Sequence, residues 1–281
     1  MPRSRQDFAV AMSGGLVYVI GGELLGTGTF PGPASDFVDI YNPATDSWSA
    51  GVPLLTPRKK LVAATVNGVI YVIGGEPPLG LDSTTVQAFD PAAPVPAWTT
   101  MASMPTGRRE AAASALNGQV CVFGGLSGPN TLSSVECLNP VANSWSPEPP
   151  MPTARSLLGS DVLGGFAYAV GGHAPLGIPA EVDTVERFNI SNRTWSSAAS
   201  VPTRRESAAV VAAAGLLFAI GGRNAAVLDS VEAYDPAVGT WRNKTSMPMP
   251  LTRLGAVAIG GSIYVFHSGN TLQYTLADDL L

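Results

Sequence analysis

The strongest constraint on the fold of this chain is a five-residue segment that recurs along it. "YVIGG" occurs at residues 18–22 and 71–75, and close variants follow at 121–125, 168–172 and 218–222. The first glycines of these five segments are separated by 53, 50, 47 and 50 residues. A period of about 50 residues is typical of repeat proteins, in which each repeat forms one small unit that packs against its neighbours.

The five tryptophans keep the same period as the glycine pairs. Each of the first four precedes the next glycine pair by 26 residues, at Trp48, Trp98, Trp145 and Trp195. The same distance counted from Trp241 ends at His267, in the segment "YVFHS" at 264–268. The chain therefore contains a sixth repeat, in which His-Ser replaces the glycine pair.

Each repeat has the pattern of four short strands. "LVAATVNGVIYVIGG" at 61–75 predicts two strands joined by an Asn-Gly turn. "FVDIYNPATDSWSA" at 37–50 predicts two more strands, joined by an Asn-Pro turn. No segment sustains a helical period, and radial packing of such sheets leaves only short edges exposed.

These glycine pairs, the Tyr or Phe three residues before most of them, the "YNP" and "YDP" turns (41–43 and 234–236) and the fourth-strand Trp resemble the kelch-repeat family. The resemblance extends from residue 5 to about 276 and implies a β-propeller, and the spacing sets the number of blades at six. We predict an all-β, six-bladed propeller with four-stranded antiparallel blades, forming a single domain over residues 1–281. The expected blades are approximately 5–50, 55–100, 105–147, 152–197, 202–243 and 250–281.

The sixth blade is expected to be incomplete. Tyr274 is its aromatic landmark, and the usual seven-residue step ends at Leu281, where other repeats have Trp. We expect strands over Ala256–Ile259, Ile263–Phe266 and about Thr271–Leu276, with the outer strand short or absent. Blades one and six would then close the ring by packing, and the open strand edge could pair with another chain, or the natural protein could be longer.

Arginines and loop residues define the expected ligand face. Five arginines lie 16 residues before a glycine pair, and the sixth such position holds Leu251, with Arg253 two residues later. The resemblance implies that these arginines and the residues after each glycine pair surround the channel mouth, because kelch proteins that bind acidic peptides use arginines there. Ion pairing between blades is the alternative role. The predicted ligand-binding residues are Arg5, Arg58, Arg108, Arg155, Arg205, Arg253, Glu23, Glu76, His173 and Arg223.

Two function classes follow from this arrangement. The first is a binding module for a protein or acidic peptide, or for a small carboxylate ligand. The alternative is an enzyme on the same scaffold, a sugar-acid isomerase, mutarotase or lyase with Glu or His as acid-base group and with no catalytic residue assigned. We expect no cofactor and no metal site, since His173 and His267 are the only histidines and lie two blades apart.

Composition narrows the possible partners. A net charge of −5 argues against nucleic-acid binding through a basic surface, and no 18-residue apolar span predicts a membrane helix. The first residues, "MPRSRQDF", lack the apolar stretch of a signal peptide, and the sequence assigns no compartment. We expect a monomer. Cys121 and Cys137 are too few for a disulfide framework or a zinc site, and we expect two buried free thiols.

Overall fold

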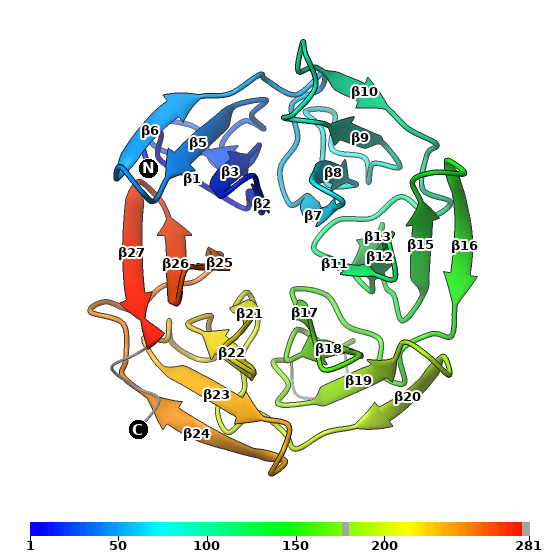
Figure 1. Ribbon diagram of the computed structural model, residues 1–281, viewed down its shortest axis with the longest axis vertical. Helices are drawn as coiled ribbons and strands as arrows, with labels where there is room; N and C mark the ends of the chain where they lie inside the picture. The colour runs from blue at the N-terminus through cyan, green and yellow to red at the C-terminus, as the bar shows by residue number, and fades with distance from the viewer. Residues whose placement is uncertain (176–179, 277–281) are drawn as a thin grey trace.

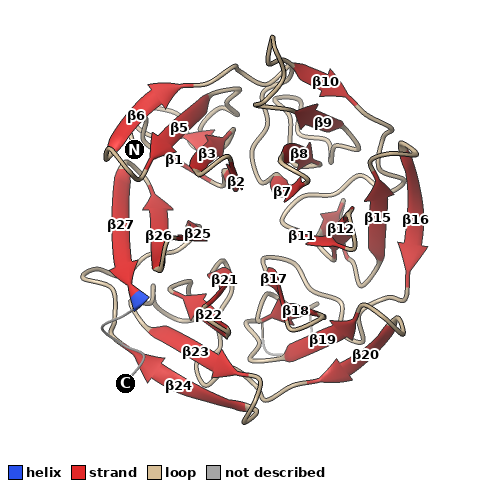
Figure 2. Ribbon diagram, viewed as in Figure 1, coloured by secondary structure: helices blue, strands red, loops and turns tan. Residues whose placement is uncertain are grey.

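The computed structural model describes residues 1–175 and 180–276, and it is a ring of six β-sheets around a central opening (Figure 1). The predicted six-bladed all-β propeller is confirmed. Strands and connecting loops make up nearly all of the described chain (Figure 2). Within these residues, no helix has the length and apolar character needed to cross a membrane.

Five blades contain four antiparallel strands in sequence order, from the channel outward. Blade one has β2 (Ala9–Ser13), β3 (Leu16–Ile20), β5 (Val38–Asn42) and β6 (Ser47–Ala50). Blade two has β7 (Val62–Val66), β8 (Val69–Ile73), β9 (Val86–Phe89) and β10 (Trp98–Thr100). Blade three has β11 (Ala112–Leu116), β12 (Gln119–Phe123), β15 (Val135–Asn139) and β16 (Ser144–Glu148).

Blade four has β17 (Gly159–Leu163), β18 (Phe166–Val170), β19 (Val185–Asn189) and β20 (Thr194–Ser197). Blade five has β21 (Ala209–Ala213), β22 (Leu216–Ile220), β23 (Val231–Asp235) and β24 (Thr240–Lys244). Blade six has β25 (Gly255–Ile259), β26 (Ser262–His267) and β27 (Asn270–Thr275). Short two-stranded sheets also form in loops outside the blades. They pair β1 (Arg5–Gln6) with β4 (Glu23–Leu24), and β13 (Leu126–Ser127) with β14 (Asn130–Thr131).

The core lies between neighbouring blades. The second strand of each blade is covered on both faces, which explains its unbroken apolar sequence; in β8, Ile70 and Val72 are fully buried. Both pack in one cluster with Tyr18 and Ile20 of blade one. Because each cluster is shared between two sheets, one repeat alone could not bury its apolar faces.

The glycine pairs are contacts between blades. The second glycine donates its N–H to the carbonyl that precedes the inner strand of the following blade; Gly75 donates to Arg108 O (2.8 Å) and Gly125 to Arg155 O (2.9 Å). The first glycine lies against the same carbonyl, and a Cβ on Gly124 would meet Arg155 O at 2.4 Å. These positions also have positive φ, so glycine is required for both conformation and space.

The arginine side chains continue this chain of contacts. Arg155 Nη1 donates to Gly171 O (2.8 Å) and Thr184 O (3.0 Å), which joins the second and third strands of its own blade. Arg58, Arg108 and Arg205 bind the first glycine of their own blades in the same way. Each of these four arginine segments therefore accepts a hydrogen bond from the preceding blade through its backbone, and its side chain joins strands of its own blade.

Four of the five arginines also bind a buried carboxylate at the second position of the third strand. The pairs are Arg5–Asp39 (2.9 Å), Arg108–Glu136 (2.8 Å), Arg155–Glu186 (2.7 Å) and Arg205–Glu232 (2.6 Å). In blade two this position holds Gln87, and burial lowers the pKa of Arg58 to about 10. In blade six, Leu251 replaces the arginine and Leu272 replaces the carboxylate. The two leucines pack in one apolar cluster.

The predicted free thiols are wrong. Cys121 in β12 and Cys137 in β15 lie directly opposite each other in the ladder, and they form a disulfide. Their separation of 16 positions concealed this proximity in the sequence, because it is the register of the second and third strands that places the two side chains together.

Blade six has three strands among the described residues, close to the predicted bounds, and β27 is its outermost strand (Figure 1). Blades one and six meet through packing, with Tyr41 and Trp48 against Phe266 at ring-centroid distances of 5.8 Å each. No ladder between these two blades is formed by the residues that the structure describes. Packing therefore contributes to ring closure, as expected, together with the Arg253–Asp7 ion pair and a hydrogen bond from the Met1 amino group to Gly269 O (3.0 Å). The predicted Trp-equivalent Leu281 lies outside the described residues.

Arg155→Ala should destabilise the protein strongly, by about 3–5 kcal/mol, because it leaves the Glu186 carboxylate buried without its cation. Arg193→Ala is the matched control: Arg193 also binds a glutamate, Glu148, at 2.7 Å, but its side chain is 58% exposed. The control should cost about 1 kcal/mol or less. Urea unfolding of the two variants measures the difference, and similar losses of stability would contradict the structural role of Arg155.

Gly124→Ala should cost more stability than Gly164→Ala. The two glycines have φ of +58° and +59°, so the backbone strain of an alanine is the same at both positions, about 1–2 kcal/mol. Only Gly124 lies against the next blade, where Arg155 O would have to move. Thermal and urea unfolding should show a clearly larger loss for Gly124→Ala; equal losses would mean that conformation alone selects these glycines.

Candidate functional site

A ring of backbone hydrogen bonds surrounds the channel mouth. In every blade the residue two positions after the arginine landmark has φ between 53° and 55°, although none is glycine. These residues are Asp7, Lys60, Glu110, Leu157, Ser207 and Arg253. Each N–H from Lys60 to Arg253 donates to the carbonyl of the preceding member, over 2.7–3.2 Å. At the remaining junction, the Arg253 Nη1–Asp7 Oδ2 ion pair of 2.8 Å joins blades six and one.

The five arginine landmarks do not reach this mouth. Their side chains are 0 or 1% exposed, and they bind backbone carbonyls and the carboxylates described above. The expectation that their guanidinium groups face the channel mouth is therefore wrong. The physical reason is that each arginine has its acceptors, and in four cases its counter-ion, inside its own blade. Arg253 differs, because it belongs to the ring at the mouth and is partly exposed.

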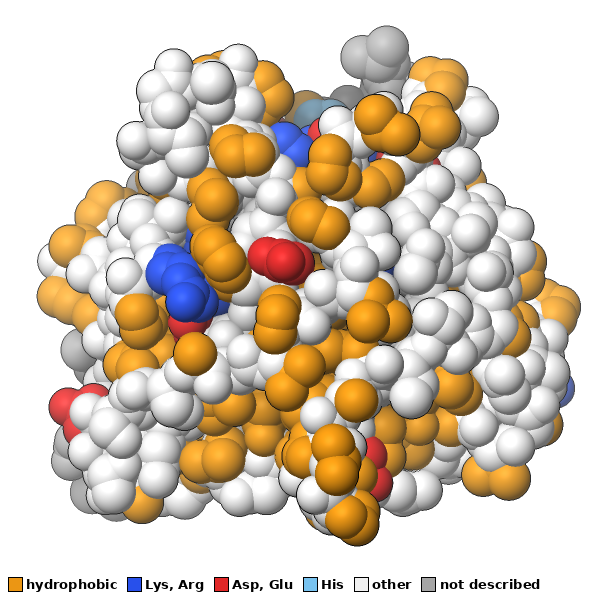
Figure 3. All heavy atoms as spheres, turned by 90° about the horizontal axis from the view of Figure 1, so that it is seen from above, with side chains coloured by type: hydrophobic (Ala, Val, Ile, Leu, Met, Phe, Trp, Pro, Cys, Tyr) orange, Lys and Arg blue, Asp and Glu red, His pale blue; other side chains and the backbone are white. Residues whose placement is uncertain are grey.

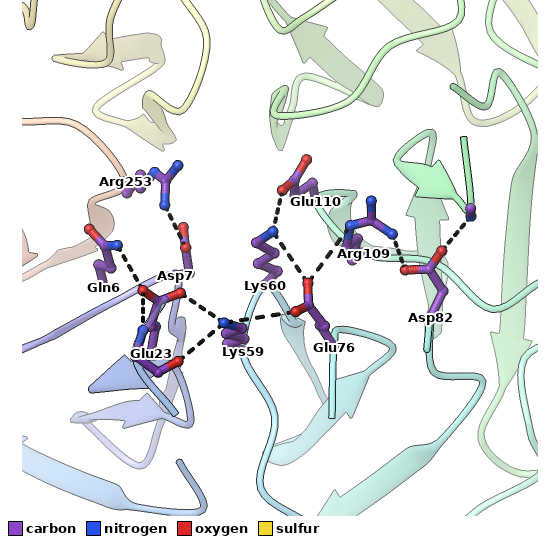
Figure 4. Close-up of polar contacts among 12 residues, drawn as sticks. Gln6, Asp7, Glu23, Lys59, Lys60, Glu76, Asp82, Arg109, Glu110 and Arg253 are labelled. Atoms are coloured by element: carbon purple, nitrogen blue, oxygen red, sulfur yellow. Dashed lines mark hydrogen bonds and ion pairs between the residues drawn. The ribbon is translucent and has the colours of Figure 1, made fainter. Parts of the chain in front are cut away.

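Charged side chains around the mouth form a network through blades one, two and three, and the Arg253–Asp7 pair lies beside it (Figure 4). Lys59 Nζ lies 3.0 Å from Glu23 Oε2 and 3.8 Å from Glu76 Oε1. Lys60 Nζ contacts Glu76 at 3.3 Å and Glu110 at 3.0 Å. Glu23 and Glu76, two of the predicted site residues, are thus brought together through one lysine.

Burial changes the proton affinities of this network. Desolvation raises the pKa of Glu23, but hydrogen bonds from Lys59 and from Gly32 N–H outweigh it, so the pKa is lowered overall. Desolvation raises the pKa of Asp7, only partly offset by Arg253 and Lys60. Glu110 and Glu76 hold the pKa of Lys60 above its usual value despite burial. The network therefore fixes Glu23 and Lys60 in their charged forms.

A second cluster lies between blades four and five. Glu206 Oε2 is 2.7 Å from His173 Nδ1, and its Oε1 is 3.3 Å from Arg223 Nε. His173 and Arg223 follow the glycine pairs of their blades, as the sequence predicted for mouth residues. The carboxylate holds both donors at one edge of the mouth.

In the contacts of Glu206 and Asp7, the partner of the carboxylate is the more exposed side chain. The side chain of Glu206 is 7% exposed, whereas those of His173 and Arg223 are 42% and 49% exposed. Asp7 is 8% exposed and Arg253 is 35% exposed. At Glu206 and Asp7 the solvent-facing groups are therefore hydrogen-bond donors, held in place by more deeply buried carboxylates.

Two hollows open at this face. The one framed by the ring residues has a volume of about 120 Å³, below the range of about 300–1,000 Å³ that is usual for small-molecule sites. A groove of about 680 Å³ lies beside it, between blades three and four. Leu126, Pro129 and Leu157 give the groove apolar walls, and His173 and Glu206 line one side. An apolar group could occupy the groove while a neighbouring acidic group reaches the donors.

Loops that follow the glycine pairs carry exposed apolar side chains. Phe30 is almost fully exposed, as is Leu79, and Leu81 is also exposed. An edge-on view shows hydrophobic side chains on two projections of this end of the molecule, with charged side chains and a histidine in the notch between them (Figure 3). Apolar loop tips beside charged groups are typical of surfaces that contact proteins.

Sequence reasoning missed much of this site. Lys59, Asp82 and Arg109 take part in the network, with Arg109 bound to Asp82, but none was among the predicted residues. The residues of the ring lie two positions after each arginine landmark, and this regular spacing could have identified them from the sequence. Among residues 1–175 and 180–276, no group of three or more His, Cys, Asp and Glu side chains could hold a metal ion.

Comparison with known proteins agrees with the repeat structure. A family model described as the kelch motif matches residues 107–152, 154–202 and 204–248, which correspond to blades three, four and five. Kelch-like protein 25 of Xenopus tropicalis is 29% identical over 177 residues, which cover 58% of this chain and 29% of that protein. Kelch-like protein terF of Aspergillus terreus is 29% identical over 201 residues, covering 66% and 42%.

A third relative is alpha-scruin of Limulus polyphemus, which is 28% identical over 183 residues, 62% of this chain and 20% of that protein. The chain spans less than half the length of these three relatives. The matched motifs, the similar proteins and the six-bladed ring agree: the chain belongs to the kelch-repeat family.

Proposed function

We propose that this propeller is a protein-interaction module that binds an acidic segment of a partner at the channel mouth. The observation that carries the proposal is that two ion pairs, Arg223–Glu206 and Arg253–Asp7, hold an exposed arginine on a buried carboxylate. Arg223 and Arg253 keep N–H donors available to solvent, and a carboxylate ligand could accept from them without displacing Asp7 or Glu206.

The surroundings favour a protein segment over a small carboxylate. The hollow framed by the ring is small, whereas the apolar groove beside His173 could hold an apolar side chain of a peptide. Phe30 and Leu79 extend from neighbouring loops and could contact a folded partner. Glu23 and Glu76 serve in this proposal as positioning residues, since both bind lysines of the network.

Arg223→Ala and Arg253→Ala should each weaken the binding of an acidic peptide about tenfold, equivalent to about 1.4 kcal/mol. The probe is fluorescein-labelled hexaglutamate, followed by fluorescence anisotropy at low salt, with hexalysine as the charge control. Added salt should weaken the interaction, because the donors are exposed.

Arg193→Ala is the matched control, since Arg193 is also exposed and bound to a glutamate but belongs to the turn before β20, at the rim. It should bind hexaglutamate as the unchanged protein does. Absence of hexaglutamate binding, or an equal loss for Arg193→Ala, would contradict the proposal. Thermal unfolding of each variant separates lost binding from lost folding.

A further inference from the structure

The turn between the third and fourth strands of blade four carries a chemical motif that the channel mouth does not use. Residues 192–194 are Asn-Arg-Thr, the pattern of an N-linked glycosylation site, in which an asparagine precedes a serine or threonine by two positions. Asn192 and Thr194 are both exposed. The turn lies at the face opposite the mouth, because β18 ends at the glycine pair and β19 runs back from it.

The contacts of Asn192 leave its amide nitrogen available. The Thr194 hydroxyl donates to Asn192 Oδ1 at 2.7 Å, and the Thr194 N–H donates to the same oxygen at 3.2 Å. Asn192 Nδ2 has no hydrogen-bond acceptor among the described residues. A glycan attached to Nδ2 would therefore break none of these contacts, and Oδ1 could keep both of its hydrogen bonds.

The corresponding turns of the other blades show that the fold does not require an asparagine at this position. Each turn begins with a side chain whose Oδ1 accepts the N–H two residues later, at Asn42, Asp90, Asn139, Asn189 and Asp235. Three positions further on, the turns of equal length in blades one, three and five have Thr45, Ala142 and Val238. These three side chains share no chemistry, so the position of Asn192 is free for a role outside the fold.

Two other asparagines stand in the same sequence pattern, but the structure places them less favourably. Asn189 is the residue that holds the turn, and it is only half-exposed, with Oδ1 bound by Ser191 N and Oγ. Asn243 lies within β24 on the same face as Trp241, which packs in a cluster shared with blade four. A glycan on Asn243 would extend toward that neighbouring blade, whereas one on Asn192 would extend into solvent.

The Cys121–Cys137 disulfide is independent evidence for the compartment in which such a modification takes place. Both cysteines are buried in the core that joins blades three and four. Disulfides form and persist in oxidising compartments, among them the lumen of the endoplasmic reticulum, and are rare in the cytosol. N-linked glycosylation takes place in the same lumen, so the disulfide and the exposed sequence pattern point to the same route through the cell.

We propose that Asn192 is a site of N-linked glycosylation. In this reaction Asn192 Nδ2 loses a proton and forms a bond to the anomeric carbon of an oligosaccharide. The bond from that carbon to a lipid-linked pyrophosphate breaks, and the lipid pyrophosphate leaves with the bonding electrons. No oxidant or reductant is consumed. Because the turn lies opposite the mouth, the glycan leaves the proposed site for an acidic segment open.

The test uses the full chain isolated from its natural source. Its peptides are treated with peptide-N-glycosidase F in heavy-oxygen water, which converts each glycosylated asparagine into an aspartate that carries the heavy isotope. Tandem mass spectrometry then separates Asn192 from Asn189. We expect the label at Asn192, and alkylation without reduction should find no free thiol at Cys121 or Cys137. An unlabelled Asn192, a label only at Asn189 or Asn243, or two free thiols would overturn the proposal.

Variants of the chain, secreted from cultured animal cells with an added secretion signal, test the same assignment. Thr194→Ala keeps Asn192 but removes the required hydroxyl, so the glycan at Asn192 should be lost. Thr194→Ser is the matched control and should retain it, as should Asn243→Gln. Thermal unfolding confirms that each variant is folded. A glycan that persists at Asn192 in Thr194→Ala, or is lost in Asn243→Gln, would contradict the proposal.

Discussion

The hydrogen bond between a glycine of one blade and the arginine segment of the next is the interaction on which this ring depends. Gly125 N–H binds Arg155 O, and the Arg155 guanidinium then binds Gly171 O of its own blade. Repetition of this step links the blades in sequence. In four blades the separation of 16 residues places the guanidinium within reach of the first-glycine carbonyl of its own blade. The bond between blades uses a backbone carbonyl, which Leu251 also supplies to Gly222 N–H.

At this face of the ring, the residues with a structural role differ from those available for binding. The deep arginines offer no donors to solvent, because their side chains are buried and their guanidinium groups bind carbonyls and carboxylates within the blades. The residues two positions further on form the ring at the mouth, where the backbone is fixed and the side chain is free to vary. Lys60, Glu110 and Ser207 share one conformation but differ in chemistry. A rigid backbone with variable side chains suits a surface for recognition.

The repeat spacing was sufficient to predict six blades and the three strands of blade six, because each strand and turn has a local pattern. The direction of the arginine side chains was not predicted, since it depends on a carboxylate in a third strand about 30 residues away, such as Glu186 for Arg155. A local signal existed: an acid stands two residues before the aromatic or leucine landmark in four blades, and Leu272 stands there in blade six, where Leu251 replaces the arginine. The Cys121–Cys137 bond likewise depended on strand register.

Native-state amide exchange of the second glycine of each pair tests the linked ring most directly. The five amides are those of Gly22, Gly75, Gly125, Gly172 and Gly222. If contacts between blades hold the ring as one unit, all five should exchange only through global unfolding, with the free energy measured by urea. Exchange of one of these amides at a much lower free energy, while the strands of its blade stay protected, would contradict this account.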